Sequence, residues 1–358
     1  MDQRVFRLGM VPQIYVSIFL VSYQQKDYIL EALNSALSQD CRSLEIVIAD
    51  DGSIDGTREI IEARIKNYTG PHKIVLLRQE PNLGLVANVN RAMAKCSGEV
   101  LVMCSGDDIL KPNRASLAAQ EFRLNLNLMA QFVNLEVIDS DSKNIRSCWS
   151  KIKNKITFSH HFNTHEVFAG LPFFVGASGA YRRTLLECFG PISTSLDAED
   201  ATLCLRALML GEVLVDPDIG VSWRWHGRNV SLGGFSRVSA KIDPVTRFKK
   251  MAQAYRQRFV FSQKIKKDIE QCIQKKKTNE ANLLKLSSLN LEDGLVCRLK
   301  FHVTHPNARF KGFILSATKL IGSEDVRLSK KIKVLSKSVL KVISPRIVLY
   351  SLARFFGR

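Results

Sequence analysis

Two pairs of carboxylates occur in the first third of the chain. Asp50-Asp51 opens the sequence DDGS, and Asp107-Asp108 closes the sequence SGDD. Carboxylate oxygens bind divalent cations and accept hydrogen bonds from the hydroxyl and N–H groups of a ligand. Each pair alone also fits turn chemistry, in which Asp or Ser caps the following helix. Both pairs at one place would instead need a cation or a hydrogen-bonding ligand to offset their charge.

A third acidic group and a histidine follow later in the chain. Glu199 and Asp200 precede an apolar pattern with helical spacing, and His226 lies within the sequence WRWHG. A carboxylate can take the proton from an attacking hydroxyl, and a histidine can bind a metal ion or a phosphate. Two alternatives stay open. Glu199 and Asp200 also suit the positive end of a helix dipole, and His226 also suits a hydrogen-bonded loop.

Alternating strand and helix patterns would position these residues. We expect an α/β fold with a mainly parallel central sheet and helices on both faces, because the strand patterns are nearly continuously apolar. Ligands of such sheets bind beyond the carboxyl ends of the strands, where both carboxylate pairs fall. The expected strands are 16–21, 44–49, 73–77, 100–103, 130–138 and 213–225, and the expected helices are 28–37, 57–66, 85–94, 183–189 and 201–210. The polar stretch 149–165 is expected to be a mobile loop.

Five stretches in this order resemble the family 2 glycosyltransferases, whose catalytic domain has the GT-A fold. The resemblance covers about Val16 to Ser231. It implies an inverting, metal-dependent enzyme that moves a sugar from a nucleotide-diphosphate donor, expected to be a UDP-sugar, to a saccharide or lipid-linked acceptor in cell-surface polysaccharide synthesis. The stretches are VSIFLVSYQQKDYILEALNSALSQ, EIVIADDGSIDGT, EPNLGLVANVNRAMAKCSGEVLVMCSGDDIL, VGASGAYRRTLLECFG, and DAEDATLCLRALMLG with WRWHGRNVS.

The same resemblance assigns roles to individual residues. Asp200 would be the catalytic base, with Glu199 as the reserve candidate. Asp107 and His226 would hold Mg²⁺ or Mn²⁺, which neutralises the charge that builds on the leaving diphosphate. The residues expected to bind the donor are Ser22, Tyr23, Asp50, Asp51, Ser105 and Asp108.

Two positions depart from the family pattern. Ser105 stands where the first Asp of the metal-binding D-x-D is expected, so one charge is missing near the metal. Val89 stands where relatives often carry an Arg. A catalytically inactive relative that acts as a scaffold is therefore an alternative function, and Ser105 is its only support.

The positive charge of the chain is concentrated at one end. The net charge is +18, yet residues 1–240 carry a net of −1 and residues 241–358 a net of +19. We therefore divide the chain into a GT-A catalytic domain, 1–240, and a basic, mostly helical C-terminal extension, 241–358. An apolar stripe among lysines at 327–342 is typical of a helix on an anionic membrane surface. Helices that pack back on the catalytic domain are the alternative.

The remaining features concern location and partners. No apolar run reaches the about 20 residues that a membrane-spanning helix needs, and no secretory signal is evident. The eight cysteines show no metal-binding spacing. We expect a cytoplasmic protein, peripheral on the inner face of the membrane. A nucleic-acid-binding protein that acts through the basic tail is a further alternative function. It is disfavoured because the tail lacks interleaved aromatic residues for base stacking.

Overall fold

The computed structural model describes residues 15–42, 44–147, 153–158, 175–194, 199–226, 229 and 268. The chain divides into two compact units. The first takes Met1–Thr157, Phe173–Pro191 and Gly211–Gly227, and the second takes Phe158–Pro172, Ile192–Leu210 and Arg228–Arg358. The expected helix at 327–342 lies outside the described residues. Within the described part, no helix has the length and apolarity to cross a bilayer.

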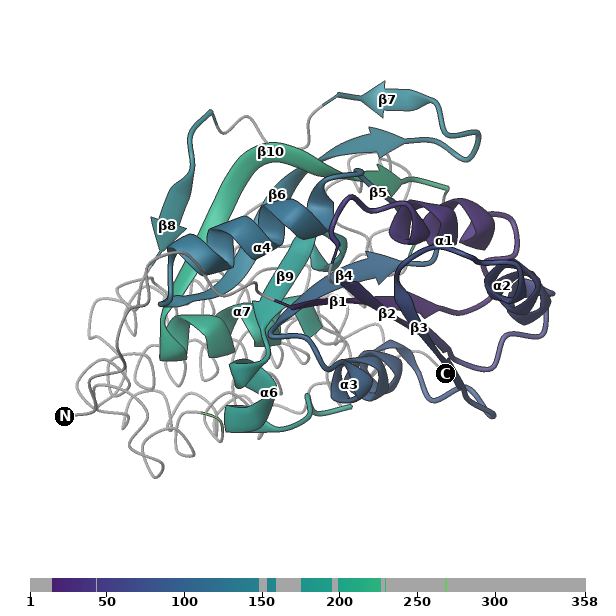
Figure 1. The fold of residues 1–358 in the computed structure, drawn as a ribbon, viewed down its shortest axis with the longest axis horizontal. Helices are drawn as coiled ribbons and strands as arrows, with labels where there is room; N and C mark the ends of the chain where they lie inside the picture. Colours follow the sequence, from purple (N-terminus) through teal and green to yellow (C-terminus); the bar gives the residue numbers. More distant parts are fainter. Residues whose placement is uncertain are drawn as a thin grey trace, which may run out of the picture. The chain divides into compact units, whose positions relative to one another are not determined.

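A single mixed sheet forms the centre of the first unit (Figure 1). Its strand order is β3-β2-β1-β4-β9-β6-β10-β5, and β7 pairs with β6. Strands β3, β2, β1 and β4 are parallel, as are β6 and β10, while β9 runs antiparallel between β4 and β6. The strands are β1 (Val16–Ser22), β2 (Leu44–Asp50), β3 (Lys73–Arg78), β4 (Val100–Ser105), β5 (Ile109–Leu110), β6 (Leu128–Ile138), β7 (Asn144–Arg146), β8 (Ile156–Phe158), β9 (Gly179–Arg182) and β10 (Glu212–Arg224).

Helices cover both faces of this sheet, as the sequence predicts. In Figure 1, α1, α2 and α4 lie above the sheet, whereas α3 and α6 lie below it. Hydrogen bonds agree with this arrangement, because the end of α1 contacts the start of α4 through Gln39 and Ala115, and Arg183 before α6 donates to Cys96 after α3. The helices are α1 (Ile29–Leu37), α2 (Thr57–Lys66), α3 (Leu85–Lys95), α4 (Arg114–Leu124) and α6 (Thr184–Phe189), with a 3₁₀ turn η1 (Gly176–Ser178).

The apolar runs explain these elements. Every residue of β1 and β2 is buried, which fits strands covered by helices on both faces. Helix α3 buries one face, and Val89 lies on it with no exposed surface. The departure from the family pattern at Val89 is thus a core position in this chain. The stretch 149–165, expected to be a loop, contains the short strand β8.

Glu45 joins the amino ends of the strands, at the edge opposite the carboxylate pairs. Its buried carboxylate accepts hydrogen bonds from Ser17 Oγ at 2.6 Å, Ser97 N at 2.7 Å and Lys73 Nζ at 2.9 Å. Burial opposes ionisation of Glu45, but these hydrogen bonds outweigh it and lower the pKa of the carboxyl group. The ionised form of Glu45 therefore stabilises the fold.

Helix α7 (Glu199–Leu210) belongs to the second unit and is buried from Thr202 to Met209. Arg206 on this helix forms a paired contact with Asp268, with Nε to Oδ2 at 2.8 Å and Nη2 to Oδ1 at 3.2 Å. The two side chains are 3% and 11% exposed. Asp268, which lies beyond residue 240, thus holds the helix that begins with Glu199 and Asp200.

Candidate active site

Parallel pairing brings the predicted donor-binding residues to one edge of the sheet. In the register of the strands, Ser22 at the end of β1 lies beside Asp50 at the end of β2. Ser105 at the end of β4 lies beside Val21 on the other side of β1. The expected convergence of DDGS and SGDD at the carboxyl ends of neighbouring strands is therefore what the fold produces.

Asp50 is fully buried and its carboxylate is engaged by the protein itself. Oδ1 accepts hydrogen bonds from Ser53 Oγ at 2.6 Å and Ser22 Oγ at 3.3 Å, and Oδ2 accepts from Ser53 N at 3.0 Å. Arg58 Nε lies 3.8 Å from Oδ2, and Arg91 donates to the Asp50 carbonyl at 2.8 Å. This geometry fixes the DDGS turn, because the Asp50 carboxylate positions both Ser22 and Ser53.

Asp51 has a different role from that of its neighbour. Its Oδ1 accepts a hydrogen bond from Leu83 N at 3.0 Å, and its Oδ2 accepts one from Gly84 N at 2.8 Å. Gly84 precedes α3 and has a positive φ of 91°, which favours glycine. Asp51 thus holds the loop before α3 against the end of β2. The bonded residues are 32 and 33 positions apart in the sequence, so no local pattern indicates these contacts.

Apolar side chains on the same edge remain open to solvent. Tyr23, Ile54 and Leu83 are 47%, 90% and 56% exposed. Gln24 joins the segments that carry Tyr23 and Ile54, because its N donates to Ser53 Oγ at 2.9 Å and its Oε1 accepts from Ile54 N at 3.2 Å. Of the predicted donor residues, Tyr23 is exposed, Ser105 is half-buried and the others are buried. Ile54 and Leu83 were not predicted.

Asp107 and His226 lie together, although they are far apart in the sequence. His226 Nε2 is 3.0 Å from Asp107 Oδ2, and the two side chains are 8% and 13% exposed. The ring of His226 stacks on Tyr28, with centroids 4.9 Å apart. The two residues expected to hold a metal thus lie together although 119 positions separate them in the sequence.

Asp108 is directed into the protein. It is 2% exposed, and its Oδ1 accepts a hydrogen bond from the main-chain N of Arg224 at 2.8 Å. Burial and the charge of Asp107 raise the pKa of Asp108 well above its usual range, while hydrogen bonds from Arg224 and Ser105 oppose that rise. Ser105 therefore interacts with the second carboxylate of the pair, as a hydroxyl donor.

Arg224 is a residue of this site that we did not predict. It is fully buried, and its Nε donates to the carbonyl of Asp107 at 2.9 Å. The signal in the sequence is an arginine between two tryptophans at the end of an apolar strand, since a buried arginine requires acceptors for its donors.

Glu199 and Asp200 begin helix α7 in the second unit, as expected. Asp200 Oδ1 accepts a hydrogen bond from Ala201 N at 2.6 Å, within the first turn of the helix. Glu199 is 8% exposed. These contacts are those of acidic residues at a helix N-terminus, the alternative that the sequence left open.

The side chains of Asp107 and His226 fit a divalent cation whose other ligands would come from a diphosphate and water. Among the described residues, no group of three or more His, Cys, Asp or Glu side chains could enclose a metal ion. Asp107 and His226 supply two donors, one oxygen and one nitrogen. Mg²⁺ and Mn²⁺ commonly take one or two protein ligands and complete their shell with phosphate oxygens and water. These two residues therefore suit a metal that arrives with the donor.

The mixed sheet with helices on both faces is a fold of the GT-A type. Residues 17–190 match the model of glycosyl transferase family 2. They therefore form a glycosyltransferase domain of that family, and the predicted family and fold are confirmed.

Three relatives illustrate this similarity. Chondroitin synthase of Escherichia coli is 31% identical over 153 residues, which are 41% of this chain and 22% of that protein. An uncharacterized glycosyltransferase of Nostoc is 27% identical over 231 residues, 63% of this chain and 69% of that protein. The structure of S. aureus TarS 1–349 with UDP-GlcNAc superposes with a TM-score of 0.52 at 19% identity, covering 92% of this chain and 82% of that TarS chain, and shows a shared fold. The chain thus spans only about a fifth of the E. coli synthase.

Proposed function

We propose that the protein is an inverting, divalent-metal-dependent glycosyltransferase that uses a nucleotide-diphosphate sugar, with a UDP-sugar as the donor. The observation that supports this most directly is the pairing of Asp107 with His226 beside the strand ends that carry Ser22 and Asp50. The acceptor proposed is a saccharide or lipid-linked hydroxyl. The similarity to chondroitin synthase supports a role in polysaccharide synthesis.

Each group has a defined task in this mechanism. Tyr23, with the turn that Asp50 fixes through Ser53, would hold the nucleoside part of the donor. Asp107 and His226 would hold Mg²⁺ or Mn²⁺, which supplies positive charge to the leaving diphosphate without proton transfer. Asp200 would take the proton from the acceptor hydroxyl as its oxygen attacks the anomeric carbon.

Calorimetry and transfer assays test this proposal together. Wild-type protein should bind a UDP-sugar more tightly with Mn²⁺ or Mg²⁺ than without, and Asp107→Asn should lose that metal dependence. Asp200→Asn should keep donor binding and lower kcat by about 10² to 10⁴-fold. Glu59→Gln, at an exposed position on α2, is the matched control and should change neither quantity. Unchanged turnover in Asp200→Asn would refute the base assignment.

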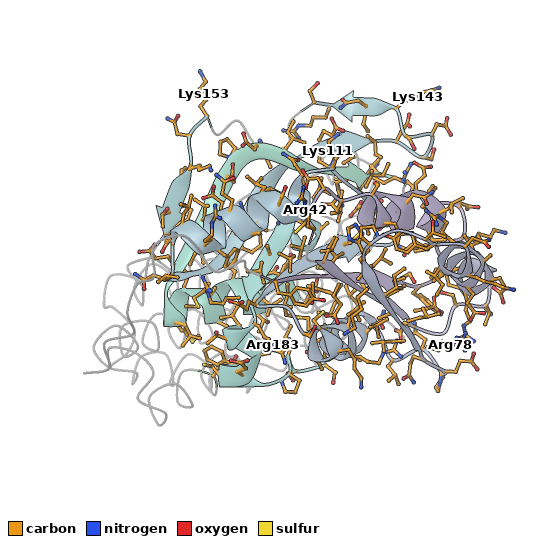
Figure 2. All side chains as sticks on the ribbon, viewed as in Figure 1. Arg42, Arg78, Lys111, Lys143, Lys153 and Arg183 are labelled. Carbon is orange, nitrogen blue, oxygen red and sulfur yellow. The ribbon has the colours of Figure 1, made fainter. Side chains whose placement is uncertain are left out.

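We propose further that the basic region 241–358 binds an anionic membrane surface and brings the active site to a lipid-linked acceptor. Its net charge of +19 supports this, at about 1 kcal/mol per basic residue close to the membrane. Basic side chains of the described part are instead spread over separate segments of the first unit, as Arg42, Arg78, Lys111, Lys143, Lys153 and Arg183 show in Figure 2. The protein should sediment with anionic vesicles, and a charge-neutral vesicle should not retain it.

A further inference from the structure

We propose that Arg224 is a positioning residue that holds Asp107 and His226 in the arrangement in which they meet the donor diphosphate. The inference rests on the proposed function, because it deepens the role of the same site. Arg224 itself has no exposed surface, so it acts through its neighbours and not on the substrate.

Arg224 contacts both members of the carboxylate pair from one place. Its guanidinium Nε donates to the Asp107 carbonyl at 2.9 Å, and its main-chain N donates to Asp108 Oδ1 at 2.8 Å. The first contact orients the peptide unit between Asp107 and Asp108. The second fixes Asp108, so the short segment between β4 and β5 is attached to the end of β10 at two points.

The remaining donors of Arg224 attach it to two other elements. Nη1 donates to the carbonyls of Asp139 and Ser140 at 3.1 and 3.3 Å and to Ser142 Oγ at 2.9 Å. Nη2 pairs with Glu31 Oε2 on α1 at 3.0 Å, and Ser142 Oγ donates to that same oxygen at 2.7 Å. The turn after β6 is itself ordered, because Asp139 Oδ1 accepts hydrogen bonds from two main-chain N–H groups within it. Arg224 is therefore fixed independently of Asp107.

Tyr28 connects Arg224 to the histidine. The guanidinium carbon of Arg224 lies 4.8 Å from the centroid of the Tyr28 ring, and the His226 ring stacks on that ring with an interplanar angle of 23°. An aromatic ring that is attracted to a cation and stacked with an imidazole keeps a defined orientation. Arg224 thus sets the position of Asp107 through a carbonyl and that of His226 through Tyr28, and the two side chains meet at 3.0 Å.

Arg182 offers a matched control elsewhere in the same unit. It donates to the carbonyls of Leu128 and Phe122 at 2.8 and 2.9 Å, and its guanidinium lies 5.2 Å from the Phe122 ring centroid. Its environment resembles that of Arg224, with carbonyl acceptors and one aromatic ring. The Arg182→Met variant therefore loses the same kinds of contact at a site without Asp107 or His226.

The experiment compares Arg224→Met, Arg224→Lys and Arg182→Met by Mn²⁺ titration in the presence of UDP. We expect Arg224→Met to bind Mn²⁺ with UDP at least 10-fold more weakly and to lower kcat for the UDP-sugar more than it raises KM. Arg224→Lys should recover part of the affinity, and Arg182→Met should bind as the wild type does, even where its Tm falls. Wild-type affinity in a folded Arg224→Met protein would overturn the proposal.

A second measurement covers two other outcomes: a variant that fails to fold and a wild type that binds no nucleotide. The ring-proton signals of His226, assigned by comparison with His226→Gln, should be shifted upfield by the stacked Tyr28 ring. They should move toward free-histidine values in Tyr28→Leu and stay in place in Tyr28→Phe. In folded Arg224→Met they should move as well, and unchanged signals there would refute the positioning role. Where Arg224→Met does not fold, unchanged His226 signals in Tyr28→Leu would refute the link through Tyr28 on which that role depends. Absence of UDP binding by the wild type would refute the proposed function alone, because the His226 signals do not depend on a ligand.

Discussion

At the scale of single residues, Ser105 shows how one missing charge is accommodated. Asp108 is buried, and its raised pKa reflects burial and the nearby charge of Asp107, which the Ser105 hydroxyl partly offsets. A carboxylate at position 105 would replace a hydrogen-bond donor with a third negative charge. The serine therefore stabilises this part of the protein in the absence of a metal ion. It also leaves one negative charge fewer to attract a cation.

A substitution that restores the D-x-D pattern tests this argument. Ser105→Asp should lower the free energy of unfolding without metal by about 1 to 3 kcal/mol, because the hydrogen bond from Ser105 to Asp108 is lost and repulsion from Asp107 is added. Added Mn²⁺ should recover more of the stability in this variant than in the wild type. Thermal unfolding with and without Mn²⁺ measures both effects, and Ser105→Ala is the control that loses the hydrogen bond alone. Equal stability of the two variants would contradict the repulsion argument.

The sequence predicts part of this site and misses the rest for a physical reason. Asp50 and Asp107 are predictable because Asp50 ends the apolar strand β2 and Asp107 lies in the short segment after the apolar strand β4. The roles of Asp51 and Arg224 depend on main-chain groups of Leu83, Gly84 and Asp107, which lie far away along the chain. Every residue has such groups, so the sequence carries no mark of which ones a buried side chain will contact.

At the scale of elements, the Asp51 hydrogen bonds determine where α3 begins. Asp51→Ala removes the acceptors for Leu83 N and Gly84 N at once. We expect a loss of about 2 to 3 kcal/mol in the free energy of unfolding, measured by urea denaturation. Amide hydrogen exchange in 83–88 should become faster than in α2, which serves as the internal reference. Unchanged exchange at the start of α3 would show that Asp51 does not hold this loop.

The Glu45 network predicts a pH dependence at the opposite edge of the sheet. Because the pKa of Glu45 is lowered in the folded protein, its contribution to stability is complete above the pKa of the unfolded chain and is lost as the pH falls. Stability measured between about pH 6 and pH 3 should therefore fall more steeply for the wild type than for Glu45→Gln. Parallel curves for the two proteins would exclude this contribution.

The helices and strands were largely predictable, but the pairing of one strand with its neighbours was not. The expected helix at 57–66 is confirmed as α2, and the strand expected at 100–103 is confirmed as β4, extended to Ser105. Local periodicity suffices for these because each buries a continuous apolar face. The antiparallel insertion of β9 between β4 and β6 was not predicted, since a run of small residues contains no pairing information.

At the scale of the whole molecule, the contact between Arg206 and Asp268 bears on the division of the chain at residue 240. A protein that ends there would leave a buried arginine on α7 without this partner. We expect such a truncation to lower the free energy of unfolding by about 3 to 5 kcal/mol. Full-length Asp268→Asn should lose part of that amount, and Arg206→Met with Asp268→Leu should recover it. Unchanged stability of the truncated protein would show that 1–240 folds independently.

The way in which Asp51 holds the loop before α3 has a consequence for how this enzyme can evolve. The carboxylate bonds only to main-chain N–H groups, whereas the side chains of Leu83 and Leu85 remain 56% and 37% exposed. Substitution at these two positions by residues other than proline therefore changes the surface at this edge of the sheet and keeps the N–H groups that Asp51 binds. Under the proposed function, donor preference can diverge here between descendants while the fold stays intact, and a library of substitutions at 83 and 85 tests this.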